Sequence, residues 1–196
     1  SLAYRRQVAG KLALLGGAAA ALAALAVADL LVGPAFLRPE LVMRALLAPG
    51  SVDPTAAIIV WDIRLPMTLM GVAVGMALGI AGVLMQTILG NPLASPYTLG
   101  LSAAAGFGAS VAILTGFTLP VLGLLTVPAS AFLAAAAASA MVYGIAHVRG
   151  MGAEVMVLAG IAILFLFQSL QSLAQYLAAP EVLRAIVFWL FGSLLK

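Results

Sequence analysis

The residues that decide the fold are 61–106, which read WDIRLPMTLMGVAVGMALGIAGVLMQTILGNPLASPYTLGLSAAAG. An arginine and a proline open an apolar run that continues to Leu89 without a charged side chain. At about 1.5 Å per residue this run is long enough to cross a hydrocarbon layer of about 30 Å. A glycine, an asparagine and two prolines interrupt it before a second apolar run begins near Leu99. The stretch therefore predicts two membrane-spanning helices joined by a tight turn.

The composition extends this prediction to the whole chain. Hydrophobic residues make up 65% of the sequence and charged residues 8%, against roughly 25% charged residues in a soluble domain. The mean hydropathy is +1.23. These values exclude a soluble globule and indicate an integral membrane protein, which is helical because its apolar runs are continuous and do not alternate. The net charge of +3 comes from few residues, so nothing supports nucleic-acid binding.

The order of the apolar runs predicts an all-α transmembrane bundle of about five spanning helices with short helices on the outer side. Arg5, Arg6 and Lys11 favour a cytoplasmic N-terminus, although the positive charges as a whole are balanced between the two sides. A signal peptide is the alternative interpretation of the first run. Asp53 before Pro54 has the pattern of a helix cap followed by proline. The predicted spans are Leu12–Val32, Pro66–Leu89, Leu99–Gly116, Val121–Ala146 and Glu154–Ala178.

Small residues line one face of the second predicted span. Gly71, Gly75 and Gly79 recur every four residues, which places them along one side of a helix. Faces of this kind let helix backbones approach closely in lipid. We therefore expect these glycines to contact a neighbouring helix. The third predicted span, which contains Gly100, Gly106 and Gly108, should pack as closely.

The turn between the second and third spans has a structural role in this interpretation. Pro92 and Pro96 lack the N–H that a helix needs, so the helix must end there. Asn91 has a short side chain that can hydrogen-bond the freed backbone. Gln86, near the end of the second span, is expected to hydrogen-bond a neighbouring helix.

Polar side chains gather in the second half of the fifth predicted span. A polar group in lipid must face protein or water, because each unpaired group costs several kcal/mol. Two interpretations stay open: the stripe bonds other helices, or it lines a water-filled translocation pathway. The residues are Gln168, Gln171, Ser172 and Gln175, which share one side of a helix.

No catalytic or metal-binding motif is present. The sequence lacks the phosphate-binding G-x(4)-GK[ST] and the zinc-binding HExxH patterns. His147 is the only histidine and Cys is absent, so a metal site has too few ligands. We expect a chain that is not an enzyme, binds no cofactor itself and takes its energy from a partner. The alternatives are a self-sufficient secondary transporter or channel, and a structural fragment of a membrane assembly.

Two ordered blocks resemble the permease subunit of binding-protein-dependent importers for iron-siderophores, haem and cobalamin, the FecCD-type family. The first block comprises Arg64-Leu65-Pro66, Gln86, Asn91-Pro92-Leu93-Ala94, Pro96, Leu99-Gly100 and Gly106. The second comprises residues 158–162 and 188–194, which are similar to the family's fifth-helix region.

The resemblance implies that residues 1–196 are a single transmembrane permease domain. It would be the N-terminal half of a roughly ten-helix chain, cut after Lys196, in the cytoplasmic (inner) membrane of a prokaryote. The implied partners are a second permease copy in a homodimer, an ATPase subunit that uses ATP and an extracytoplasmic substrate-binding protein. The fifth helix of the family lines the channel, which favours the pathway interpretation of the stripe. In the family an R-L-P-R motif docks the binding protein; Arg64 matches its first arginine, and Met67 stands here in place of its second arginine.

Overall fold

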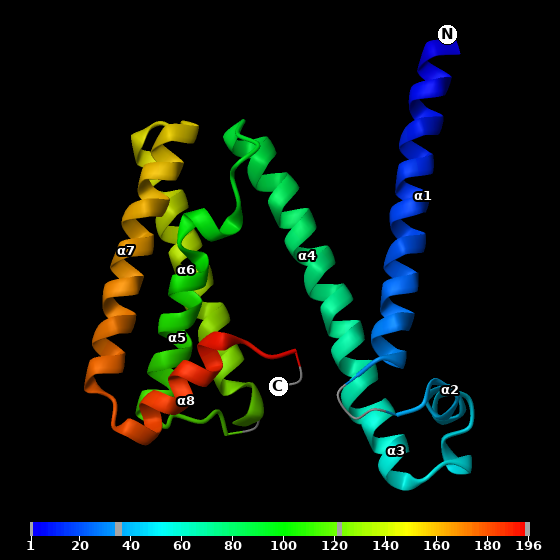
Figure 1. Ribbon diagram of the computed structural model, residues 1–196. Coiled ribbons are helices and arrows are strands. Elements are labelled where there is room, and N and C mark those ends of the chain that lie inside the picture. Colours follow the sequence, from blue (N-terminus) through cyan, green and yellow to red (C-terminus); the bar gives the residue numbers. More distant parts are fainter. Residues whose placement is uncertain (1, 34–36, 121–122, 195–196) are drawn as a thin grey trace. The chain divides into compact units, whose positions relative to one another are not determined.

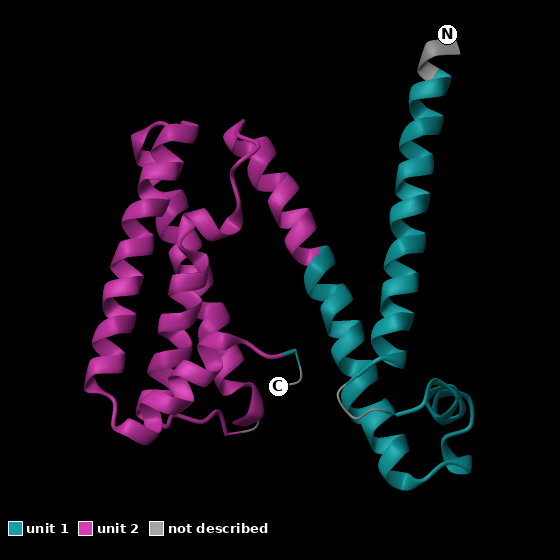
Figure 2. Ribbon diagram, viewed as in Figure 1, with its two compact units in different colours: residues 1–76, 194–196 teal, residues 77–193 magenta. Residues whose placement is uncertain are grey.

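Helices form every regular element of the computed structural model over the residues that it describes, 2–33, 37–120 and 123–194 (Figure 1). The chain divides into two compact units, residues 1–76 with 194–196 and residues 77–193 (Figure 2). The predicted all-helical membrane fold is confirmed. Each unit has its own packing.

Unit 1 contains a long apolar helix and several short ones. Its core is formed by Val42, Ala45 and Val60, which are fully buried. Trp61 links η2 to α2 beside this core, because its indole Nε1 donates a hydrogen bond of 2.9 Å to the carbonyl of Ala45. The elements are α1 (Leu2–Leu31), α2 (Pro39–Leu47), the 3-10 turn η1 (Pro49–Ser51), α3 (Pro54–Ile58), the π-helical turn η2 (Ile59–Arg64) and the first part of α4 (Leu65–Leu89).

The second predicted span is part of a longer helical run than the sequence suggested. The predicted cap is present: the Asp53 carboxylate accepts a hydrogen bond of 3.0 Å from the Thr55 N–H. From Pro54 the run continues for 36 residues to Leu89, so the short helix and the span are one continuous rod. The π turn joins them because the Leu65 N–H bonds the carbonyl of Val60, five residues back.

Unit 2 is a packed group of helices. In its core α5, α6 and α7 contact one another, and Phe107 of α5 meets Phe167 of α7 with ring centroids 5.7 Å apart. The elements are the end of α4, the 3-10 turn η3 (Pro96–Leu99), α5 (Leu101–Thr115), the 3-10 turn η4 (Gly123–Leu125), α6 (Thr126–Arg149), α7 (Ala153–Leu177) and α8 (Pro180–Phe191).

Four helices, not five, are long and apolar enough to cross a membrane in the part of the chain that the structure describes. The exception is α5, the third predicted span, which has 15 residues. Its predicted first residue, Leu99, ends the turn η3, and Gly100 then adopts a φ of 76° that a helix does not allow. Gly116, with a φ of 64°, ends the helix. At about 1.5 Å per residue α5 is roughly 22 Å long, less than the hydrocarbon thickness.

The predicted close packing of the third span is confirmed. A Cβ on Gly108 would collide with the carbonyl oxygen of Ser130 and lie 2.6 Å from the Cβ of Ala134, both in α6. A Cβ on Gly160 of α7 would lie 2.9 Å from the Cα of Leu99. Backbones therefore touch at these glycines, which is how small residues let helices pack in lipid.

The small face of α4 has no comparable neighbour. A Cβ on Gly71 would meet only the side chain of Leu194, at 3.7 Å. No atom of the described residues lies within 4 Å of the equivalent points at Gly75 and Gly79. Packing through this face therefore stays a prediction that requires a helix from outside the described residues.

Candidate functional site

The predicted polar stripe lies along one flank of α7. Phe167 and Ala174 mark the side of the helix that is buried against α5 and α6. At about 100° per residue, the stripe occupies the side next to this packed face. Its members therefore differ in environment: Gln171 and Gln175 are half-buried, whereas Gln168 and Ser172 are exposed.

Gln171 packs against the backbone of α5. Its Oε1 lies 2.6 Å from the point where a Cβ would stand on Gly106, and the Leu190 side chain of α8 lies 3.0 Å from the same point. The Ser110 hydroxyl donates a hydrogen bond of 2.7 Å to the carbonyl of Gly106 in the same turn. The glycine thus leaves room for a carboxamide where α5, α7 and α8 meet. The pathway role of the stripe as a whole stays a prediction.

The turn after α4 is closed by two side-chain hydrogen bonds. Asn91 Oδ1 accepts from the Leu93 N–H at 2.9 Å, the local bond that its position suggested. Gln86 Nε2 donates to the carbonyl of Pro92 at 3.0 Å. The expectation that Gln86 reaches a neighbouring helix is therefore wrong: it satisfies a carbonyl of the turn that follows its own helix. Pro96 begins η3, whose Leu99 is buried beside α7.

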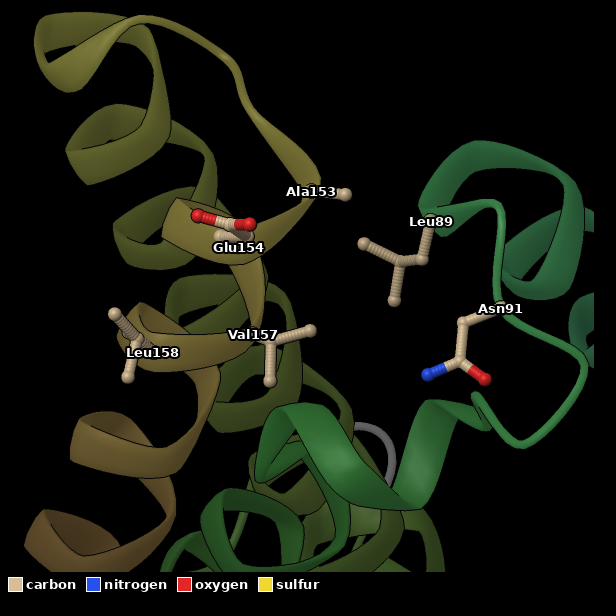
Figure 3. A pocket seen from close by; sticks show the side chains of 6 residues that line it. All are labelled: Leu89, Asn91, Ala153, Glu154, Val157 and Leu158. Carbon is tan, nitrogen blue, oxygen red and sulfur yellow. The ribbon is translucent and has the colours of Figure 1, made fainter.

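A cleft of about 430 Å³ separates this turn from the start of α7 (Figure 3). Its walls are aliphatic, and its polar groups are the Asn91 carboxamide and the Glu154 carboxylate. Glu154 lies in the first turn of α7, where the helix dipole stabilises a negative charge. One carboxylate and one carboxamide provide no acid–base pair or metal site. The lining residues are Leu89, Asn91, Ala153, Glu154, Val157 and Leu158.

Arg64 is buried in unit 1, with 6% of its surface exposed. Its Nη1 donates to the carbonyls of Leu30 and Leu31 at 2.9 and 3.3 Å. These are carbonyls of the last turn of α1, which have no partner within their own helix and carry its negative dipole end. Gly33 leaves the necessary space, because a Cβ there would lie 2.8 Å from the guanidinium carbon. The arginine, the last residue of η2, therefore caps α1 from the residue directly before α4.

A second contact joins the same two helices. The Thr68 hydroxyl lies 2.5 Å from Asp29 Oδ2 and 3.0 Å from the Arg64 carbonyl. Thr68 is buried and was not singled out by the sequence, and Asp29 had no expected partner there. Their positions in the sequence could have predicted this contact. Asp29 lies near the end of one span and Thr68 near the start of the next, and two such ends lie at the same membrane depth when the chain turns back.

Arg64 is buried, whereas the docking role implied by the resemblance requires an exposed side chain. A docking residue must reach an acidic side chain of another protein, and here the guanidinium is turned inward to α1. Its Nε and Nη2 are buried and have no hydrogen-bond partner among the described residues. Docking by Arg64 stays a prediction, and the geometry does not support it.

Arg64→Met in the full-length protein is expected to lower the free energy of unfolding by about 1–3 kcal/mol, because hydrogen bonds from a charged donor to buried carbonyls are lost. The measurement is the fraction that stays monodisperse after heating in detergent. Arg184→Met is the control: Arg184 is exposed, and its contacts with the Glu181 carboxylate at 3.3 Å and the Pro180 carbonyl at 3.4 Å lie within α8 and contribute little. Unchanged stability of Arg64→Met, with loss of binding-protein association, would favour the docking role instead.

Long apolar helices and a flank of uncharged polar side chains on α7 are the features of a multi-pass membrane chain. The sequence matches the FecCD transport family over residues 21–196, and the chain belongs to that family. It is a multi-pass inner-membrane protein and not a catalytic subunit.

Three related proteins show how far the similarity reaches. The vitamin B12 import system permease BtuC of Escherichia coli is 34% identical over 151 residues, which are 75% of this chain and 44% of BtuC. The molybdate import system permease MolB of Haemophilus influenzae is 35% identical over 144 residues, 72% of this chain and 41% of MolB. A solved structure described as an inward-facing metal-chelate type ABC transporter has a TM-score of 0.74 and 30% identity, covering 93% of this chain and 54% of that one. The chain thus spans about half the length of these relatives.

Proposed function

We propose that this chain is part of the permease subunit of an ATP-binding-cassette importer that moves an iron chelate (a siderophore complex or haem) or cobalamin across the inner membrane. A separate ATPase subunit supplies the energy, and an extracytoplasmic binding protein delivers the substrate. Two permease copies form the transmembrane pathway, and the N-terminus of each lies in the cytoplasm.

The observation that carries the proposal is the family match over residues 21–196 of a chain whose helices are long and apolar. One feature of the structure supports it. The polar flank of α7 gives a hydrated solute a surface to pass, with Gln168 and Ser172 exposed. Two of the three relatives described above support the proposed substrate class, since one is a vitamin B12 permease and one is of metal-chelate type, whereas the third is a molybdate permease.

The test is uptake of radiolabelled ferric siderophore, haem, cobalamin and molybdate into proteoliposomes that contain the full-length permease with its ATPase and binding protein. We expect uptake of a chelate or of cobalamin, and no uptake when the ATPase carries an inactivating substitution in its phosphate-binding lysine. Uptake that continues without ATP hydrolysis would indicate the secondary transporter or channel. Uptake of molybdate alone would contradict the proposed substrate class but would still support an ATP-driven importer.

A further inference from the structure

The cleft between the turn after α4 and the start of α7 is lined by two free polar groups. Asn91 Oδ1 accepts the hydrogen bond of the Leu93 N–H, which fixes the carboxamide and leaves its Nδ2 without a partner in the described part of the chain. Figure 3 shows this nitrogen on the side that faces α7. The Glu154 carboxylate likewise forms no ion pair with any described residue. The cleft therefore offers one amide donor and one negative charge.

This cleft lies at the boundary of the hydrocarbon layer. α4 ends at Leu89 and α7 begins at Ala153, and both helices are long and apolar enough to span a membrane. The phosphate and amine groups of lipids lie at this depth, just outside the hydrocarbon. Val157 and Leu158 line the cleft one turn further into α7, and Leu158 has 67% of its surface exposed. The polar groups are therefore at headgroup level, and the aliphatic wall continues toward the acyl chains.

We propose that this cleft binds an ethanolamine phospholipid. The ammonium group of the lipid donates hydrogen bonds to the Glu154 carboxylate, and its phosphodiester accepts one from Asn91 Nδ2. Part of an acyl chain lies along the aliphatic wall. Hydrogen bonds between ionised groups are stronger than those between neutral groups. The volume of about 430 Å³ is within the range of about 300–1,000 Å³ that is usual for ligand pockets. The inference goes beyond the proposed function, since it depends on no particular transport substrate.

The same two groups disfavour the other common occupants of such a cleft. The Glu154 carboxylate repels a headgroup that carries only negative charge, such as that of phosphatidylglycerol. Phosphatidylcholine has a quaternary ammonium without N–H groups, so it cannot donate a hydrogen bond to the carboxylate. A protein segment could cover the aliphatic wall, but it would have to bring a cation to Glu154. Charge complementarity therefore favours a headgroup that carries an ammonium and a phosphate together.

The experiment titrates the delipidated full-length permease–ATPase complex with phosphatidylethanolamine, phosphatidylcholine and phosphatidylglycerol of equal acyl chains, and measures binding by native mass spectrometry. Glu154→Gln is expected to weaken phosphatidylethanolamine binding about tenfold and to leave phosphatidylcholine binding unchanged, because only the ammonium N–H groups use the charge. Asn91→Asp should have an effect of similar size. Its carboxylate can still accept from the Leu93 N–H, so the turn is kept, but it repels the phosphodiester.

The control for these variants is Glu40→Gln. Glu40 is an exposed carboxylate in the first turn of α2, and it does not line the cleft. Its replacement removes the same charge from the protein and should leave the affinity for all three lipids unchanged. Unchanged phosphatidylcholine binding in the two cleft variants shows that they are folded.

Three results would overturn the inference. Equal affinity of the wild type for the ethanolamine and choline lipids would assign the cleft to acyl chains alone. Preference for phosphatidylglycerol would assign it to an anionic lipid. Phosphatidylethanolamine binding that neither cleft variant changes would indicate that another part of the full-length protein fills the cleft. None of these results bears on the proposed function, which is measured separately as substrate uptake.

Discussion

Replacing Gln168, Ser172 and Gln175 by leucine in the full-length permease is expected to lower the initial rate of substrate uptake at least tenfold. Each of these side chains can hydrogen-bond a passing solute or its water, and a hydrogen bond contributes about 0.5–1.5 kcal/mol. The loss of three therefore exceeds the roughly 1.4 kcal/mol that corresponds to a tenfold change in rate. The measurement is uptake into proteoliposomes at matched permease content, with basal ATPase activity recorded beside it.

The matched control for the stripe is Ser169→Leu. Ser169 is exposed on the same helix but outside the stripe, and its hydroxyl donates to the carbonyl of Phe165 at 2.8 Å, within α7. We expect its uptake to equal that of the wild type. Uptake that is unchanged in the triple variant would show that the stripe serves packing and does not line a pathway. Equal losses in both variants would show that α7 tolerates no added bulk, which contradicts a specific role.

Gly108→Leu is expected to prevent the folded state from forming, and Gly108→Ala to destabilise it by about 1–3 kcal/mol, the usual cost of overpacking a core. The reason is the contact between backbones: even one added methyl group at Gly108 meets the carbonyl of Ser130 and the Cβ of Ala134. α5 and α6 would have to separate to admit it. The measurement is the yield of monodisperse protein and its midpoint of thermal aggregation in detergent.

Gly144 provides the control for this effect, since it lies in α6 and no described residue outside its own stretch of helix backbone comes within 4 Å of its Cβ position. Gly144→Ala is expected to be neutral or to stabilise the helix by up to about 1 kcal/mol, because alanine is the better helix former. Gly144→Leu should also fold. A Gly108→Ala protein as stable as Gly144→Ala would contradict the close contact of α5 and α6.

The elements of this fold follow from local features of the sequence, so most were predictable. Continuous apolar runs predict α1, α4, α6 and α7. The Asp53 cap predicts the start of α3, because the capping hydrogen bond joins residues only two positions apart. The local bond of Asn91 has the same origin. The length of α5 was not predictable in this way, because an apolar run does not reveal that its first residue ends a 3-10 turn and is followed by a glycine with positive φ.

The parts of the site that the sequence did not reveal depend on contacts between distant residues. The guanidinium of Arg64 bonds carbonyls more than thirty positions earlier, which was not foreseen. Nothing in the spacing shows that α1 ends beside it. Gln171 belongs to the stripe by helical period, yet the absence of a side chain at Gly106 determines where its carboxamide lies. The pathway, docking and α4 packing roles need partners, and they stay predictions.

The shortness of α5 places irregular backbone at membrane depth. A helix of roughly 22 Å leaves several ångströms of a hydrocarbon layer of about 30 Å unmatched. Because α5 packs against α6, α7 and α8, this depth is filled inside the protein, and the backbone groups of the irregular segment need protein or water as hydrogen-bond partners. A hydrated vestibule at this depth would shorten the distance over which a polar solute is dehydrated.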